Sequence, residues 1–126
     1  MVQEQAEPAA ESILRRLEQA INDRDLEALV GCFREDVVIE HPAHPARSTR
    51  GRDQVWRNWA PVMAGMADFK ATLVRFAADK DIVWAEWYWQ GTQADGSAGD
   101  MAGVIIHGLA GDEIAWTHFY LEPVDK

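Results

Sequence analysis

The sequence predicts an α+β fold in which helices pack against one face of a curved sheet. Apolar side chains recur at helical spacing in the first half of the 126-residue chain, whereas the second half, from residue 69, is a run of strands joined by short turns. No repeat, low-complexity segment or linker divides this pattern. We therefore expect a single domain over residues 11–126, preceded by a polar and flexible N-terminus over residues 1–10.

Three helices are expected in the first half. The apolar stripe of the first helix begins near residue 11 and ends where the polar segment 22–25 breaks the pattern. Asp25 can cap a second, shorter helix, because its carboxylate can accept a hydrogen bond from a free N–H group of the first turn. A third helix follows Gly51 and is expected to end near Gly65, and Pro61 inside its pattern is expected to kink or shorten it.

The first strand ends on a histidine and is stopped by Pro42. Because neighbouring side chains of a strand point to opposite faces, His41 shares a face with Val37 and Ile39. Histidine titrates near neutral pH, so this strand places a candidate acid–base group at the rim of an apolar surface.

Four further strands are expected over residues 69–76, 82–90, 101–109 and 113–121. Parity within each strand nominates the side chains that face the interior. The side chains assigned to the interior are Trp87 in the strand 82–90, Met101, Ile105 and His107 in the strand 101–109, and Ile114, Trp116, His118 and Tyr120 in the strand 113–121.

The opposite faces of these strands are also largely apolar. A sheet that is apolar on both sides must be covered twice, so we expect a homodimer that forms through the sheet face away from the helices. Glu86 lies among tryptophans and is either a buried partner of a histidine in the cavity or an exposed charge at the dimer face.

Composition excludes several partners. The net charge of −9, from 12 basic and 21 acidic residues, argues against nucleic-acid or anionic-membrane binding, because both require a basic patch. The sequence also lacks an apolar run near the roughly 18 residues of a membrane span, and its acidic N-terminus does not resemble a signal peptide. Cys32 is interpreted as a small core residue. A cytoplasmic location is the expectation.

The motifs of covalent, dinucleotide and phosphoryl-transfer chemistry are absent from the sequence, so no cofactor is expected. The spacing of His41 and His44 resembles that of two metal ligands. Prolines make their segment an extended loop, however, so no metal site is expected. What the chain can support is proton transfer in a mostly apolar cavity. The six tryptophans favour either an aromatic-lined pocket or an aromatic subunit interface.

Four stretches, over residues 20–29, 36–42, 51–56 and 111–120, resemble the nuclear transport factor 2-like superfamily, in particular its SnoaL-like branch of polyketide cyclase-like and ketosteroid isomerase-like proteins. The resemblance implies a cone-shaped α+β barrel, in which a curved, mostly antiparallel sheet wraps around the three helices and a ligand enters at the open end. The superfamily includes isomerases, cyclases, dehydratases, hydrolases and binders, so the resemblance speaks more for fold than for function.

The resemblance also implies where catalytic groups would lie. Steroid isomerases of this superfamily carry their catalytic carboxylate at the position of His41, a tyrosine donor near Leu17 and a protonated acid near Ile105. Without those two donors the oxyanion hole is lost, which disfavours steroid isomerisation of that type. The cyclases use an acidic residue for which His107 or His118 would have to substitute. The Asp-Arg-Asp constellation of the epoxide hydrolases cannot be assembled.

We therefore expect a cofactor-independent lyase, isomerase or cyclase that acts on a hydrophobic, cyclic metabolite, with His41 as general base and His118 as general acid or orienting donor. Asn58 or Tyr120 is expected to hydrogen-bond a developing oxyanion. Two alternatives are a non-catalytic binder of an apolar ligand and a dimeric scaffold whose cone is filled by its own tryptophans. The expected ligand-binding side chains are Leu17, Trp56, Trp59, Met63, Trp87, Met101, Ile105, His107, Trp116 and Tyr120.

Overall fold

The computed structural model describes residues 2–125, with side chains from residue 8 onward. Within this range the order of elements is α1 (Val2–Asn22), α2 (Leu26–Val30), β1 (Phe33–Glu40), a 3-10 turn (Pro45–Arg47), β2 (Thr49–Arg50), α3 (Arg52–Gly65), β3 (Lys70–Asp79), β4 (Ile82–Gln90), β5 (Met101–Ala110) and β6 (Glu113–Pro123). The predicted order of helices and strands is confirmed, and the short strand β2 is an addition to it.

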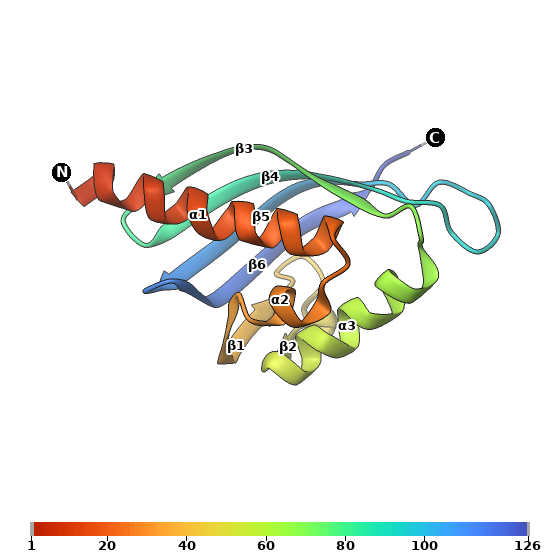
Figure 1. Ribbon diagram of the computed structural model, residues 1–126, viewed down its shortest axis with the longest axis horizontal. Coiled ribbons are helices and arrows are strands. Elements are labelled where there is room, and N and C mark those ends of the chain that lie inside the picture. The colour runs from red at the N-terminus through yellow and green to blue at the C-terminus, as the bar shows by residue number, and fades with distance from the viewer. Residues whose placement is uncertain (1, 126) are drawn as a thin grey trace.

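The strands form one curved, mixed sheet in the order β2-β1-β6-β5-β4-β3. β1 and β6 are parallel, and all other neighbours are antiparallel. The sheet is open, with β2 and β3 as its edges. Figure 1 shows α1 crossing one face of the sheet, while α2 and α3 lie beside the end that contains β1 and β2. The predicted α+β architecture with helices on one face is thus confirmed.

Polar side chains of α1 hold this helix against the β3 edge. Asn22 donates from Nδ2 to the Ala71 carbonyl at 2.9 Å and accepts the Ala71 N–H on Oδ1 at 2.8 Å. Glu18 accepts the Leu73 N–H on Oε2 at 2.8 Å. These bonds satisfy backbone groups that an edge strand leaves without a strand partner. They also fix α1 over the concave face of the sheet.

The first helix differs in extent from the sequence pattern, whereas the third does not. α1 begins at Val2, so it includes residues outside the apolar stripe that starts near residue 11. Ala10 is fully buried in the core, whereas the flexibility expected of residues 1–10 stays a prediction. α3 continues through Pro61 to Gly65, so Pro61 does not shorten it and the expected end at Gly65 is confirmed, whereas a kink stays a prediction.

A β-bulge in β6 exchanges the interior and exterior positions of that strand. In its register with β5, Ala115 is an extra residue between Ile114 and Trp116. Ile114 is fully buried, and so is Thr117 three residues later, although regular alternation would place them on opposite faces. The interior assignment is therefore wrong for the residues after the bulge, and the outer face carries Trp116, His118 and Tyr120.

Candidate functional site

A cavity of about 390 Å³ lies between α3 and the concave face of the sheet. Its volume falls in the range of small-molecule sites in proteins. This cavity argues against the alternative of a scaffold whose cone is filled by its own tryptophans. The lining side chains are mostly apolar, with three polar exceptions, and they belong to Phe33, Ile39, His41, Arg47, Val55, Asn58, Trp59, Val62, Met66, Phe69, Trp89, Met101, Phe119 and Leu121.

Four aromatic rings form one wall of the cavity. Trp59 of α3 contacts Phe69 and Trp89 in edge-to-face geometry, with ring centroids 5.8 and 5.1 Å apart. Trp89 also meets Phe119 of β6 at 6.5 Å. Edge-to-face contacts are a preferred geometry of aromatic pairs and restrict the freedom of each ring. The wall is a firm apolar surface against which a flat ring can pack.

His41 lies at the edge of this cavity, directly after β1 ends at Glu40. Its imidazole stacks on Phe119, with ring centroids 5.0 Å apart and an angle of 12° between the planes. The pKa of His41 is lowered from 6.5, first by burial and then by the positive charge of Arg47 and by His44, while Glu122 acts in the opposite sense. The imidazole is therefore neutral at neutral pH and can accept a proton.

Arg47 and Asn58 are the other polar side chains that line the cavity. Among the side chains described, those of residues 8–125, the Arg47 guanidinium has no hydrogen-bond or ion-pair partner. Asn58 accepts a hydrogen bond on Oδ1 from Gln54 Nε2 at 3.0 Å, so its own Nδ2 remains a donor. Both side chains can thus donate hydrogen bonds to an oxygen atom bound in the same cavity as His41.

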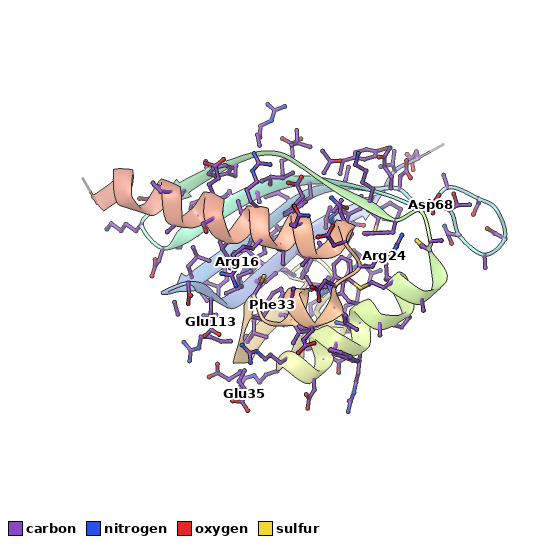
Figure 2. The ribbon with its side chains drawn as sticks, in the orientation of Figure 1. Arg16, Arg24, Phe33, Glu35, Asp68 and Glu113 are labelled. Carbon is purple, nitrogen blue, oxygen red and sulfur yellow. The ribbon has the colours of Figure 1, made fainter. Side chains whose placement is uncertain are left out.

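Two polar side chains, Arg24 and Asp68, bond to segments near the cavity; both are labelled in Figure 2. Arg24 donates to the carbonyls of Ala67 and Phe69, the latter at 3.4 Å. Asp68 accepts from the Thr92 N–H at 2.9 Å and from the Thr92 hydroxyl at 2.6 Å. These bonds join the end of α1 and the start of the β4–β5 loop to the segment that carries Phe69 into the cavity.

The start of α3 is anchored on the opposite side of the cavity. Arg52 donates from Nε to the Phe33 carbonyl at 2.6 Å and from a terminal nitrogen to Glu113 Oε2 at 3.0 Å. Phe33 and Glu113, labelled in Figure 2, belong to β1 and β6. One guanidinium therefore ties α3 to two neighbouring strands and fixes the helix that supplies Trp59.

A second void of about 20 Å³ lies deeper in the cone. It shares the side chains of Phe33, Trp59, Trp89 and Phe119 with the main cavity. Four of the predicted ligand-binding side chains line this void rather than the main cavity, namely Leu17, Trp87, Ile105 and His107.

His107 is fully buried on β5, at an interior position as its parity predicts. One ring nitrogen, Nδ1, lies 2.8 Å from Thr117 Oγ1. The other, Nε2, has no hydrogen-bond partner within the described part of the chain. Burial lowers the pKa of His107 from 6.5 to about 3, so this ring stays neutral and cannot serve as an acid at neutral pH.

The remaining predicted site residues have different positions. Trp59 and Met101 line the main cavity as predicted. Met63 is half-buried and packs against the core, but it is not among the lining side chains. Trp56 is 46% exposed on α3. Trp56 and Met63 share a helix with Trp59, and helical periodicity alone does not tell which of the three reaches a cavity.

His118 does not face His41 across the cavity. It pairs in register with Glu40, and its Nε2 lies 3.8 Å from Glu40 Oε1 on the outer face of the sheet. Its ring also contacts Trp116, with centroids 4.9 Å apart. Glu86 also lies on this outer face, where it forms an ion pair with Arg75 at 3.0 Å. Of the two positions considered for Glu86, the structure thus shows the outer one and not the cavity.

Sequence reasoning missed Phe119, Trp89 and Arg47 as lining residues. Regular alternation from Ile114 puts Phe119 on the outer face, because the bulge at Ala115 leaves no clear signature in the sequence. Trp89 shares parity with Trp87, so the same argument that nominated Trp87 would have found it. Arg47 lies in the loop after His41, and this closeness in sequence was the only available signal.

The described residues include no group of three or more His, Cys, Asp or Glu side chains that could hold a metal ion. His44 instead pairs with Glu122 at 3.1 Å. Cys32 is buried in the core as predicted, and burial raises the pKa of its thiol. None of the described helices is both long and apolar enough to span a membrane.

Comparison with known proteins identifies relatives at the level of family and fold. The sequence model of the SnoaL-like domain family matches residues 14–117. A comparison with curated proteins found no match.

Solved structures give the same fold. A protein with a ketosteroid isomerase-like fold from Catenulispora acidiphila, in complex with trimethylamine, is 19% identical, with a TM-score of 0.74 and coverage of 86% of this chain and 84% of that one. A Mycobacterium tuberculosis protein in complex with estradiol-17beta-hemisuccinate is 15% identical, with a TM-score of 0.75 and coverage of 89% and 92%. An NTF2-like protein of unknown function from Burkholderia pseudomallei is 15% identical, with a TM-score of 0.76 and coverage of 92% and 91%. At such identities the likeness shows the fold and not the activity.

Proposed function

Since the chain belongs to the SnoaL-like domain family, we propose that it binds an apolar, ring-containing small molecule in its main cavity and that His41 removes a proton from that molecule. The reaction class is that of a cofactor-independent lyase, isomerase or cyclase. In each of these, a base takes a proton from a carbon next to an electron-withdrawing group, and the electron pair left behind moves toward that group.

One observation carries the proposal: a neutral imidazole lies at the edge of a mostly apolar cavity. The lowered pKa of His41 means that it is unprotonated at neutral pH, as a general base must be. Its stacking on Phe119 fixes the plane of the ring beside the space that a ligand would fill. A base held in place in this way loses little orientational entropy when a ligand arrives.

Arg47 and Asn58 support the same chemistry. Removal of a proton next to a carbonyl group leaves negative charge on the carbonyl oxygen, and donors near that oxygen stabilise the charge. Both residues line the cavity that His41 lines. They would supply the hydrogen-bond donors that this chain lacks at Leu17 and Ile105, from a different part of the cone.

The related structures support a small organic ligand. Two proteins of the same fold were solved with trimethylamine and with estradiol-17beta-hemisuccinate. The aromatic wall of Trp59, Trp89 and Phe119 suits the flat apolar rings of a cyclic ligand.

A second candidate is non-catalytic binding of the same class of ligand. It is favoured by the position of His118 on the outer face, because this leaves His41 without the second acid–base histidine expected from the sequence. In that case His41, Arg47 and Asn58 would only orient the ligand through hydrogen bonds.

Exchange of ligand protons for deuterium distinguishes these two candidates. 2-Tetralone is a two-ring ketone with acidic C–H groups next to its carbonyl, and its binding can be followed by quenching of tryptophan fluorescence. If His41 is a base, the protein speeds the uptake of deuterium at those carbons in D₂O, and His41→Gln abolishes the effect. Saturable binding without faster exchange would favour the non-catalytic binder.

We also propose that the outer face of the sheet is the interface of a homodimer. This face carries Trp84 and Tyr120, which are 40% and 41% exposed. Large exposed aromatic side chains on one sheet face are typical of surfaces that a second subunit covers. A buried, unpaired cysteine is consistent with the cytoplasm, which we propose as the location of the protein.

A further inference from the structure

The opening of the main cavity carries a positive charge that no acidic side chain of the described lining balances. Arg47 is exposed and also lines the cavity, so it lies at the opening. The lining includes no Asp or Glu among the residues that the structure describes. By contrast, the guanidinium of Arg52 on α3 is paired with Glu113. The charge of Arg47 is thus available to a group that arrives from solution.

A carboxylate near Arg47, that of Glu122, is paired with a different residue. Besides burial, which lowers the pKa of His41 most, Arg47 lowers it and Glu122 raises it, so both charges lie near this imidazole. Glu122 nevertheless pairs with His44, whose Nε2 lies 3.1 Å from its Oε2. The protein therefore leaves Arg47 without the carboxylate that its own surroundings could have supplied.

Hydrogen bonds within the segment 41–48 fix the position of Arg47. The N–H of Arg47 donates to the His44 carbonyl at 2.9 Å, and the N–H of His44 donates to the His41 carbonyl at 2.8 Å. Ser48 closes the segment, because its Oγ accepts the His41 N–H at 3.1 Å. This turn returns the chain to the end of β1 and places Arg47 on the same cavity as His41. An arginine on a closed turn loses less freedom when it binds a ligand than one on an open loop.

We infer that Arg47 anchors a carboxylate, so that the ligand is a ring-containing carboxylic acid with its ring against the aromatic wall and its carboxylate at the cavity opening. The planar guanidinium can donate two parallel hydrogen bonds to the two oxygens of a carboxylate. The lining around it is mostly apolar, which strengthens such a pair relative to one in open water. The inference rests on the proposed binding function and names the chemical class of its ligand.

The distribution of charge in the cone favours a single carboxylate in this orientation. The described lining of the main cavity includes one Arg and no Lys, so a phosphate dianion would keep an unbalanced charge beside apolar side chains. The small inner void has neither Arg nor Lys in its described lining, so the charged end belongs at the opening and the ring inside. The remaining N–H groups of Arg47 and the Nδ2 of Asn58 stay available for an oxyanion.

A pair of probes of matched shape tests the anchor in the unmodified protein. 2-Naphthoate and 2-naphthamide carry a charged carboxylate and a neutral amide on the same two-ring system. By isothermal titration calorimetry at neutral pH and low ionic strength, we expect 2-naphthoate to bind about tenfold more tightly, which corresponds to about 1.4 kcal/mol. Added salt should reduce this preference, because it screens the exposed side of the ion pair.

Three arginine variants locate the preference. Arg47→Gln removes the charge and should remove most of the preference, with 2-naphthamide still bound. Arg47→Lys keeps the charge without the planar fork and should retain part of it. Arg50→Gln is the matched control and should keep the full preference, because it removes the same charge from a nearby exposed residue on β2 that does not line the cavity.

The outcomes separate the anchor from the binding function. Equal affinity of the wild-type protein for both probes overturns the anchor and leaves the binding function standing. A preference that survives in Arg47→Gln does the same, because the carboxylate is then recognised elsewhere. Equal losses in Arg47→Gln and Arg50→Gln also overturn the anchor, since net charge alone would then explain the preference. Failure of both probes to bind overturns the binding function and the anchor with it.

Discussion

At the scale of single residues, the proposed chemistry depends on the charge state of His41. Burial and the neighbouring Arg47 cation both disfavour the protonated imidazole, so the pKa of His41 lies below 6.5. Stacking on Phe119 orients the ring, and the strand that ends at Glu40 places it at the cavity edge. Base strength is thereby set by the surroundings of the residue as well as by its type.

The pH dependence of catalysis tests this charge state. The base form of His41 increases as pH rises through its lowered pKa, so kcat/KM should rise with pH, reach half its maximum below pH 6.5, and then level off. Arg47→Gln removes a positive charge that lowers this pKa, so the midpoint should move to higher pH. A midpoint that does not move would show that Arg47 does not act on the base. The profile is measured by deuterium exchange of 2-tetralone across a pH series.

His107 should make the protein sensitive to acid. Its pKa is about 3 in the folded state and about 6.5 in the unfolded chain, so between these values the unfolded state alone gains the proton. The free energy of unfolding should therefore keep its full value above pH 6.5. As the pH drops below 6.5, it should fall by up to about 1.4 kcal/mol per pH unit. His107→Gln should show a shallower loss in urea unfolding at pH 7 and pH 5. Parallel losses in both proteins would contradict this.

The sequence identified some of these residues and could not identify others. His41 was found because strand parity and Pro42 together fix its face and its place at the strand end. The interior position of His107 followed from parity in the regular strand β5. Phe119 and His118 were exchanged between the two faces, because parity holds only as far as a strand is regular.

At the scale of the elements, the β5–β6 pair depends on close backbone contact. Gly103 has a φ of +150°, and a Cβ atom there would lie 2.2 Å from the Tyr120 carbonyl oxygen and 3.0 Å from Leu121 Cα. The two strands must separate to admit any side chain at this position. They supply Met101, Phe119 and Leu121 to the cavity, so their spacing also sets its width.

Gly103→Ala should therefore destabilise the fold, by about 1–3 kcal/mol in urea unfolding, as overpacking does elsewhere. Gly65→Ala is the matched control, since a Cβ atom there meets no atom within 4 Å. Equal stability of the two variants would mean that β5 and β6 move apart to admit a Cβ atom at little cost in free energy.

Sequence periodicity predicted the helices and strands better than the bulge within β6 and the contacts between distant segments. The helical stripe and the strand parities predicted three helices and the order of the elements along the chain, because these patterns reflect burial on one side of each element. The bulge in β6 and the clamp of Asn22 on Ala71 were not predictable, because both arise from contacts between segments far apart in the sequence. Pro61 proved compatible with a helix that continues to Gly65.

At the scale of the whole molecule, the two faces of the sheet differ in what they expose. The concave face forms the cavity, and the outer face carries the exposed side chains of Trp84 and Tyr120. If the outer face is a dimer interface, burial of these side chains stabilises the sheet without closing the cavity.

A charge on the outer face should dissociate such a dimer. Trp84→Glu places a carboxylate among apolar side chains and should convert the protein to a monomer in sedimentation velocity experiments at micromolar concentration. Trp56→Glu is the control, because Trp56 is similarly exposed but lies on α3. Dissociation by Trp56→Glu instead would place the interface at the helix, and a wild-type monomer would contradict the dimer altogether.

The central claim is that His41 acts as a base inside the cavity, and deuterium uptake by 2-tetralone in D₂O tests it most directly. We expect the wild-type protein to speed exchange at the carbons next to the carbonyl group, and His41→Gln to lower this rate by about 100-fold or more while 2-tetralone still binds. His118→Gln, on the outer face, should keep the wild-type rate. An unchanged rate in His41→Gln would contradict the account.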